Sequence, residues 1–597
     1  MIMPHTGAYL SRCLCLAAIT ALALPGALPI TAAMAAPASA VEPLSPADGL
    51  AAIIADYERF SADYPMEAGR SDPAFARDRW PDESPPAMAR RRAALDAFAA
   101  RLDALDPAGL TAEARINRDY LRALIGWRIE GIDLDERRFA FVAHEGFYNT
   151  PYAVARSLRI ESASEARAWV ERMGGITAYF AQQRANLERG IATGWTHPDV
   201  VIDVAVAVLD KQIARAPADD PMVEPLAPYP AEAARAAALI EREIRPVQRA
   251  LRAYIDGSYR AHARDALGIA AVPGGRAYYD FLLRYYTTTD LSAEEIHRMG
   301  LSEVARIRAE MDKVIASTGF DGSFADWLHF LRSDPRFYAT SREGLIEKYA
   351  AATKRIDGVL PRYFSVLPRQ PFTIIPVPRE LEEGYTTARG GGGGDFAKGF
   401  AGTFVVNTSH LDQRPLYEVP ALSLHEAAPG HHTHAALNRE NGQLPSFRRA
   451  GDLLAFREGW ALYAERLGHE MGVYRDAFEK FGSLSTEMWR ACRMVVDTGI
   501  HVMGWSYDRA RRCFSDNTAL ADVNIDTELA RYIGAPGGAV AYKVGELKIV
   551  EMRRRAEAAL GDGFDIRAFH DLILAQGQLP MTLLEQKIDR WIAAGGR

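Results

Sequence analysis

A histidine-rich stretch at residues 422–434 constrains the fold more than any other part of the sequence. It reads Leu-Ser-Leu-His-Glu-Ala-Ala-Pro-Gly-His-His-Thr-His, so Glu426 directly follows His425, and His431 and His432 come six and seven residues after that first histidine. Histidine is a common zinc ligand, and a non-ligand glutamate beside it is typical of the base in zinc hydrolases. The stretch therefore predicts a metal site.

The spacing of these histidines excludes one straight helix. At about 100° per residue, His425 and His431 would point about 240° apart. His425 and His432 would share a face, but about 10 Å of rise would separate them, too far for one ion with bonds near 2 Å. Pro429 and Gly430 predict a break, because proline cannot continue the helical hydrogen bonds and glycine permits unusual backbone angles.

We therefore predict that His425 and His431 bind the ion, with His432 as the alternative second ligand, and that Glu426 is the general base. A polar helix end with clustered surface histidines is the other interpretation. Two histidines, one carboxylate and an open position favour zinc, and we expect one zinc ion per chain.

A third ligand is expected in the helical segment 452–468. Asp452 is suited to cap its N-terminus and Gly468 to end it. Glu458 lies in the apolar part of this segment, where a buried carboxylate needs a partner such as a metal ion or an arginine. Glu465, two turns further along the same face, is expected to orient a ligand.

The motifs at 425–432 and 458–465 resemble those of the bacterial domain of unknown function 885 family. The resemblance extends to residues 286–291, 490–501, 531–532 and 536–543, and so covers most of the mature chain. It implies a zincin-like fold, similar to metallopeptidases with two histidines and a glutamate on zinc, more firmly than it implies a substrate. One departure is His434, where the family is expected to have glutamine.

Polar residues further along the chain are candidates for the other roles of a hydrolase. Arg490, Arg493, Asp497 and His501 recur at intervals of three and four, which predicts one polar helix stripe. Its apolar surroundings favour a buried network near the site over a row of solvent-facing ion pairs.

Two pairs of residues receive specific roles. We predict that His501 and Tyr542 donate hydrogen bonds to a transition-state oxygen, and that Arg531 and Lys543 bind a substrate carboxylate.

The segment 402–408, which includes Asn407, is predicted to be a strand that binds peptide along its edge, with a purely structural strand as the alternative. The five glycines at 390–394 predict a flexible loop.

The first forty residues predict a signal peptide. Arg12 precedes an apolar run at 13–33, and Ala38-Ser39-Ala40 is a typical cleavage site. An uncleaved membrane anchor is the alternative. We expect cleavage near Ala40, a periplasmic or secreted protein, and no stable membrane insertion afterwards.

Cleavage would leave two cysteines, Cys492 and Cys513, for which free thiols are favoured over a disulfide because no spacing pattern links them. The formal net charge is −7 and no basic stripe occurs, so nucleic acid is not an expected partner.

The composition predicts a mainly α fold. Residues rich in alanine, leucine, glutamate and arginine favour helix after helix in an N-terminal region at 41–270. The region 271–597 is expected to be catalytic, and Ser292 with Glu295 predicts a capping box that opens a helix to about Ile315. We expect a zincin-like metallopeptidase fold with a small sheet beside the metal-binding helix and a central cleft.

These observations predict an exported zinc-dependent hydrolase, most simply one that cleaves short peptides. The alternatives are a metal-dependent amidase or esterase on another substrate, and a non-catalytic periplasmic binding protein. Glu426 disfavours the binding protein, because that carboxylate is not needed to hold zinc.

Overall fold

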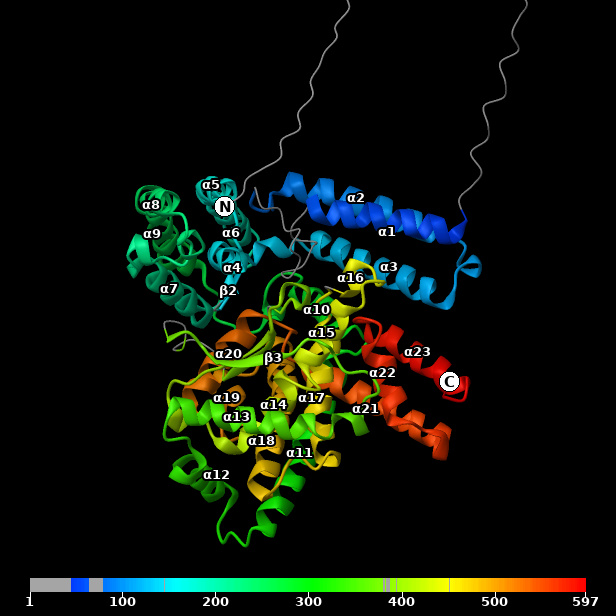
Figure 1. Cartoon of the computed structure of the whole chain (residues 1–597). Helices are drawn as coiled ribbons and strands as arrows, with labels where there is room; N and C mark the ends of the chain where they lie inside the picture. The colour runs from blue at the N-terminus through cyan, green and yellow to red at the C-terminus, as the bar shows by residue number, and fades with distance from the viewer. Residues whose placement is uncertain are drawn as a thin grey trace, which may run out of the picture. The chain divides into compact units, whose positions relative to one another are not determined.

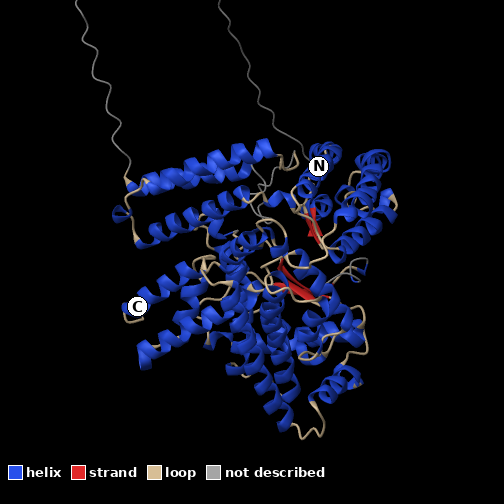
Figure 2. Ribbon diagram, turned by 180° about the vertical axis from the view of Figure 1, so that it is seen from behind, coloured by secondary structure: helices blue, strands red, loops and turns tan. Residues whose placement is uncertain are grey.

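Helices make up most of the described chain, as the composition predicted (Figure 1, Figure 2). The computed structural model describes residues 45–63, 79–143, 145–379, 382, 387–392, 394–449 and 451–596. The predicted signal peptide at 1–40 lies outside these residues. No helix in the described part is long and apolar enough to span a membrane.

The α-helices fall into two groups along the chain, separated by the segment 358–418, which carries the larger sheet. In the first part they are α1 Pro46–Asp63, α2 Pro85–Asp103, α3 Ala112–Asp133, α4 Thr150–Ser157, α5 Ala163–Gly174, α6 Ile176–Ala192, α7 Asp199–Ala214, α8 Pro230–Leu239, α9 Arg245–Tyr254, α10 Gly275–Thr287, α11 Ala293–Ser317, α12 Phe324–Ser333 and α13 Arg342–Asp357. In the second part they are α14 Val419–Glu426, α15 His431–Glu440, α16 Ser446–Arg449, α17 Leu454–Glu470, α18 Ala477–His501, α19 Tyr507–Ser515, α20 Asp522–Gly534, α21 Ala541–Leu560, α22 Ile566–Leu574 and α23 Met581–Ala593.

Two small sheets interrupt the helices. β1 Phe141–Val142 pairs with β2 Glu145–Gly146. β3 Phe372–Pro376, β4 Ala388–Gly392 and β5 Gly402–Val406 form a second sheet in the order β3-β5-β4. In this sheet β3 runs parallel to β5 and β4 runs antiparallel to it. The glycine-rich segment was expected to be a loop, but its first three glycines belong to β4. Pairing with β5 fixes the extended backbone of these residues, which have no side chains to favour a strand.

Of the two helix N-caps predicted from the sequence, at Ser292 and at Asp452, the structure confirms the one at Ser292. The Ser292–Glu295 capping box is present at the start of α11, which runs to Ser317. Asp452 does not cap α17; the cap position is Leu453, and the Asp452 carboxylate instead pairs with Arg457 at 3.0 Å. The Asp452 carboxylate therefore binds the Arg457 guanidinium and not the backbone amides at the start of α17, to which the local sequence pattern had assigned it.

The boundary expected near residue 270 does not separate two compact units. Residues 45–597 form one compact unit, and its buried apolar clusters cross that boundary. One cluster joins Leu187 of α6 to Val496 of α18, and another joins Leu50 of α1 to Trp591 of α23. The N-terminal helices therefore share their cores with the region that carries the metal-site motifs.

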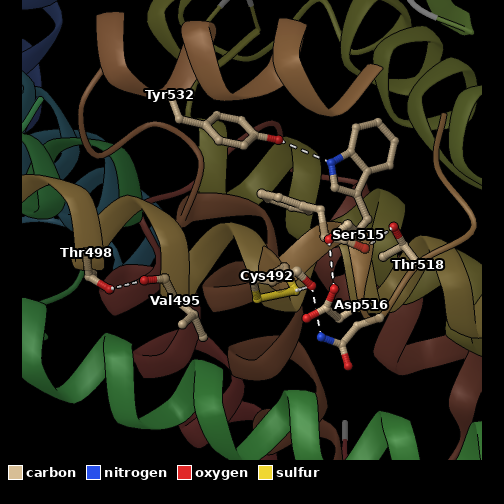
Figure 3. The surroundings of a disulfide bond; sticks show 11 residues. Cys492, Val495, Thr498, Ser515, Asp516, Thr518 and Tyr532 are labelled. Carbon is tan, nitrogen blue, oxygen red and sulfur yellow. Dashed lines mark hydrogen bonds between the residues drawn. A yellow bond between two sulfur atoms is a disulfide. The ribbon is translucent and has the colours of Figure 1, made fainter. Parts of the chain in front are cut away.

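Cys492 and Cys513 form a disulfide, contrary to the free thiols favoured from the sequence (Figure 3). The chain turns after α18, so that α19 packs beside it and brings the two Cα atoms to 5.8 Å. This separation is ordinary for a disulfide. The pairing depends on that helix packing, which no cysteine spacing reveals.

Candidate metal centre

The helix breaks between the two predicted histidine ligands, as the sequence indicated. α14 ends at Glu426, α15 begins at His431, and the Ala428–Pro429 peptide bond is cis. The Gly430 amide donates to the Leu424 carbonyl at 3.0 Å, and a Cβ at Gly430 would lie inside contact distance of the His425 carbonyl oxygen. The break therefore requires glycine at this position.

A buried tryptophan from α17 holds the break in place. Trp460 is fully buried, and its indole N–H donates to the Pro429 carbonyl at 2.8 Å. That carbonyl lies between two helix ends, where it has no intrahelical partner. Because Trp460 is two residues from Glu458, the same contact sets the position of α17 relative to both histidines.

His425, His431 and Glu458 meet in one buried cluster. Their ligand atoms all lie within 4.8 Å of one another. Glu458 Oε2 is 3.4 Å from His425 Nε2 and 3.3 Å from His431 Nε2. Ligand bonds of about 2.1 Å at tetrahedral angles give ligand-to-ligand distances of about 3.4 Å, and the two distances from Glu458 match this value. Two histidines and a carboxylate are also a donor set that zinc accepts.

His432 is not part of this cluster. Its Nε2 is hydrogen-bonded to the Gln370 carbonyl at 2.9 Å, and its ring packs against Phe372 with centroids 4.8 Å apart. Burial lowers the pKa of its imidazole. His432 thus joins the start of α15 to β3, and the geometry favours His431 as the second ligand.

Glu465 orients His425 in the way the sequence predicted. One carboxylate oxygen is 2.7 Å from His425 Nδ1, and the other accepts from the Thr486 hydroxyl at 2.5 Å. This bond directs His425 Nε2 toward Glu458. Burial opposes a charged imidazole, but hydrogen bonds to Glu458 and Glu465 outweigh burial and raise the pKa of His425 to about 9.

An arginine supports the third ligand from the other side. The Arg457 guanidinium lies 3.0 Å from Glu458 Oε1, which leaves Oε2 facing the histidines. Burial raises the pKa of the Glu458 carboxyl, but the charges of Arg457 and His431 outweigh burial and hold it well below its usual range. Glu458 therefore has both partners that the sequence offered as alternatives, an arginine and the metal-binding cluster.

Glu426 lies beside the cluster without belonging to it. Its Oε2 accepts from the Gly390 amide of β4 at 2.6 Å. A Cβ at Gly390 would lie inside contact distance of the Glu426 carbonyl oxygen, so β4 approaches α14 closely only because this residue is glycine. The backbone of β4 thus fixes a carboxylate next to the metal ligands.

Tyr542 lies near a close helix crossing, and its hydroxyl is within electrostatic range of Glu458. α17 and α21 touch at Gly459 and Gly545, where an added Cβ on either would lie inside contact distance of the other helix's backbone. Tyr542 is one turn before Gly545, and Glu458 is adjacent to Gly459. Burial raises the pKa of the Tyr542 hydroxyl, and the Glu458 charge adds to this effect, so the phenol stays protonated at neutral pH.

Comparison with known proteins places the chain in a family. A family model described as a bacterial protein of unknown function (DUF885) matches residues 65–588. The chain belongs to this family. The resemblance inferred from the two motifs is confirmed.

Two solved structures are similar to this DUF885 chain over most of its length. The structure titled "putative lipoprotein from Colwellia psychrerythraea" has a TM-score of 0.86 at 24% identity, over 92% of this chain and 100% of that one. A "putative lipoprotein of unknown function from Shewanella oneidensis" has a TM-score of 0.71 at 18% identity, over 91% and 99% of the two chains. These likenesses show the fold alone. No curated protein matches.

Lys543 does not have the geometry of a substrate ligand. Its ammonium is fully buried, 2.6 Å from Glu487 and 3.1 Å from Glu303, and also pairs with Glu546. These carboxylates come from α18, α11 and α21, so Lys543 neutralises a buried acidic cluster that joins three helices. The predicted carboxylate-binding role is contradicted, because no donor of this ammonium faces solvent.

His501 is also occupied elsewhere. The Ile269 amide donates to its Nδ1 at 3.2 Å, and its Nε2 donates to the Tyr532 carbonyl at 3.0 Å. Burial lowers the pKa of its imidazole to about 3. Both ring nitrogens bind backbone, so the structure contradicts an oxyanion-donor role and makes His501 a link between helices. The stripe that contains it is buried, as expected.

Asn407 is fully buried and stabilises a loop. Its amide donates to the Glu382 carbonyl at 2.9 Å, and its side-chain oxygen accepts from Ser409. The strand β5 before it is the centre of its sheet, with β3 and β4 on its two edges. An added peptide strand cannot pair with β5, so the substrate-binding prediction for Asn407 is contradicted; the strand next to Glu426 is β4.

A cavity of about 560 Å³ lies beside the break, where Ala428 and His432 line it. Its wall is formed by α13, β3 and residues of the break, including Lys354, Phe372 and His432. The three metal-binding candidates are absent from this wall. It is therefore not the central cleft predicted above the metal site.

Two residues near the centre had no assigned role in the sequence. Arg457 directly precedes Glu458 in the sequence, so an ion pair between this arginine and the predicted ligand could have been predicted. Gly390 lay in a glycine run that suggested only flexibility. Its contact with Glu426 bridges 36 positions of sequence and has no local signal.

Proposed function

We propose that this DUF885 chain is an exported, zinc-dependent hydrolase with a zincin-like site that cleaves peptides. The observation that carries the proposal is the spacing of about 3.4 Å between Glu458 Oε2 and the two imidazole nitrogens. The second support is Glu426, a carboxylate beside the cluster that is held by a backbone amide and not by the ligands.

His425, His431 and Glu458 would hold the ion, and Glu465 would keep the His425 ring in the ligating orientation. A zinc ion there would supply positive charge that acidifies a water molecule and polarises a substrate carbonyl. Glu426 would accept the proton of the attacking water and pass it to the leaving amine. The bond between Gly390 and Glu426 Oε2 fixes one carboxylate oxygen and leaves Oε1 for this transfer.

Tyr542 is the proposed donor to the developing oxyanion. Its hydroxyl is protonated at neutral pH and lies beside the metal ligand Glu458. A phenol held by a close helix crossing needs little reorganisation when charge develops on the substrate oxygen. Both His501 and Tyr542 were predicted from the sequence to be oxyanion donors, and only Tyr542 is now proposed for this role, because both ring nitrogens of His501 bind backbone groups.

β4 is the proposed strand for peptide binding. It is an edge strand of its sheet, and the bond from its Gly390 amide to Glu426 holds it beside the proposed general base. An extended peptide along this edge would place its backbone beside the general base. Export is supported by the signal-like N-terminus and by two structural relatives described as lipoproteins.

The test compares two zinc-loaded variants, Glu426→Gln and the control Glu470→Gln. The metal content and the rate of peptide hydrolysis are measured for each variant and for the parent. Glu470 ends α17 and pairs with Arg553 at the surface, so its variant controls for the loss of one carboxylate. We expect Glu426→Gln to keep about one zinc per chain and lose turnover by at least about 100-fold. Near-normal turnover would exclude Glu426 as the base, and a parent that never binds zinc would overturn the proposal.

A further inference from the structure

A pair of arginines beside Tyr542 has more positive charge than its surroundings balance. Arg493 of α18 and Arg531 of α20 both approach Glu528 Oε2, at 3.0 Å and 2.6 Å. The Tyr532 hydroxyl donates to the same oxygen. Two guanidinium groups thus share one oxygen of one carboxylate. The other carboxylate that interacts with Arg531 is Asp497, and because burial raises its pKa to about 7 it is only partly ionised at neutral pH, so the pair keeps an excess of positive charge.

Arg493 is buried with an unused donor. Only 4% of its surface is exposed, and its Nη1 has no hydrogen-bond partner among the described residues. Its Nε donates to the Tyr532 hydroxyl at 2.6 Å, so the other side of the guanidinium is fixed. A buried guanidinium N–H without an acceptor is unfavourable, and an anion that reaches it would be bound strongly.

The same guanidinium lies next to the proposed catalytic machinery. Its central carbon is 4.5 Å from the centre of the Tyr542 ring, and Tyr542 stands beside Glu458 at the α17–α21 crossing. Arg531 is the accessible member of the pair, with 36% of its side chain exposed. A ligand of the pair would therefore approach from the side of Arg531.

We propose that Arg493 and Arg531 form a subsite for the free C-terminal carboxylate of a peptide substrate. The proposal rests on the proposed function and narrows it: the chain would release short fragments from the C-terminal end of peptides. Planar guanidinium groups match a carboxylate with two parallel hydrogen bonds, and the unbalanced charge would be neutralised by the peptide's own terminus. Lys543, the other predicted carboxylate binder, is replaced by Arg493.

Peptide amides test the subsite directly. N-acetylated trialanine and its C-terminal amide differ only in the terminal charge. We expect the zinc-loaded parent to hydrolyse the acid with kcat/KM at least about 30-fold above that of the amide, because a buried charge pair is lost in the amide. Equal kcat/KM for the two peptides would overturn the subsite and leave the hydrolase proposal intact.

Three variants separate a specific subsite from a general effect of charge. Arg531→Gln should lower kcat/KM for the acid toward that for the amide, and Arg531→Lys should restore part of the preference. Arg511→Gln is the matched control: Arg511 pairs with Asp522 and Asp526 of the same helix α20, away from Glu528. A control that changes the preference as much as Arg531→Gln would overturn the proposal.

Binding to an inactive form keeps the test independent of turnover. Zinc-loaded Glu426→Gln would be titrated calorimetrically with both peptides, alone and combined with Arg531→Gln. If the acid binds more tightly than the amide, and Arg531→Gln removes this difference, the subsite is supported. This holds even if the parent cleaves neither peptide, and in that case only the hydrolase proposal fails. Equal binding of acid and amide would refute the subsite whatever the turnover.

Discussion

Replacing Glu465 with glutamine should weaken zinc binding without changing any ligand. Glu465 is 4% exposed and joins His425 Nδ1 to the Thr486 hydroxyl, with Arg490 at 3.8 Å. Glutamine has nearly the same shape. Its amide oxygen can still accept from His425, so the variant removes the negative charge and keeps the hydrogen bond.

The contacts of Glu465 indicate how much zinc affinity each variant should lose. Outer partners of ligating histidines typically contribute 10–100-fold to metal affinity, or about 1.4–2.7 kcal/mol. Glu465→Gln should fall near about 10-fold, because only the charge is lost. Glu465→Ala should approach about 100-fold, because His425 Nδ1–H is then left without an acceptor in a buried site.

The assay is a competition titration of zinc against a chromophoric chelator, with the free energy of unfolding measured in parallel. Glu479→Gln is the control, because Glu479 is also a buried carboxylate paired with an arginine, Arg475, but does not contact His425. We expect the control to bind zinc like the parent. A zinc Kd for Glu465→Gln within about twofold of the parent would refute the role of Glu465 in orienting the ligand.

Three further predictions follow from the centre and its surroundings. His431→Ala should lose zinc while His432→Ala keeps it, which metal analysis checks; the reverse result would move the second ligand to His432. Gly390→Ala should lower kcat by about 100-fold with zinc retained, because the new Cβ displaces Glu426 from its position, whereas Gly442→Ala, which has open space around it, should behave like the parent. Burial raises the pKa of Asp497 to about 7, so the folded state prefers the protonated acid, and its contribution to stability falls as pH rises from about 4 to 7. Asp497→Asn should therefore gain up to a few kcal/mol over the parent between pH 5 and pH 8 in denaturant unfolding, and parallel pH profiles would contradict this.

The sequence predicted the helical class and the composition of the centre. Pro429 and Gly430 between two histidines demanded a broken helix, and the structure has one. Glu458 and Glu465 share a helical face two turns apart, which led to the predictions that Glu458 is a ligand and that Glu465 orients one. The structure shows Glu465 bonded to His425 Nδ1, and the ligand role of Glu458 stays a prediction. Each of these inferences uses residues within one or two turns of each other, where backbone geometry limits the arrangements.

Residues with suitable chemistry but distant partners were assigned wrongly. Lys543 is paired with Glu487 and Glu303, and His501 with Ile269 and Tyr532. From the sequence alone, a lysine that neutralises a buried cluster cannot be distinguished from one that awaits a substrate.

What the sequence determined by itself was which side chains could hold a metal and where the helix between them had to break, since both depend on contacts along the local chain. Tertiary structure decided which strands lie at the sheet edges, whether the two cysteines pair, and which charged groups are fully paired inside the protein, as Lys543 is. The physical reason is that burial and pairing depend on elements brought together from distant parts of the chain, and a side chain's function depends on the donors and acceptors that these contacts leave unpaired.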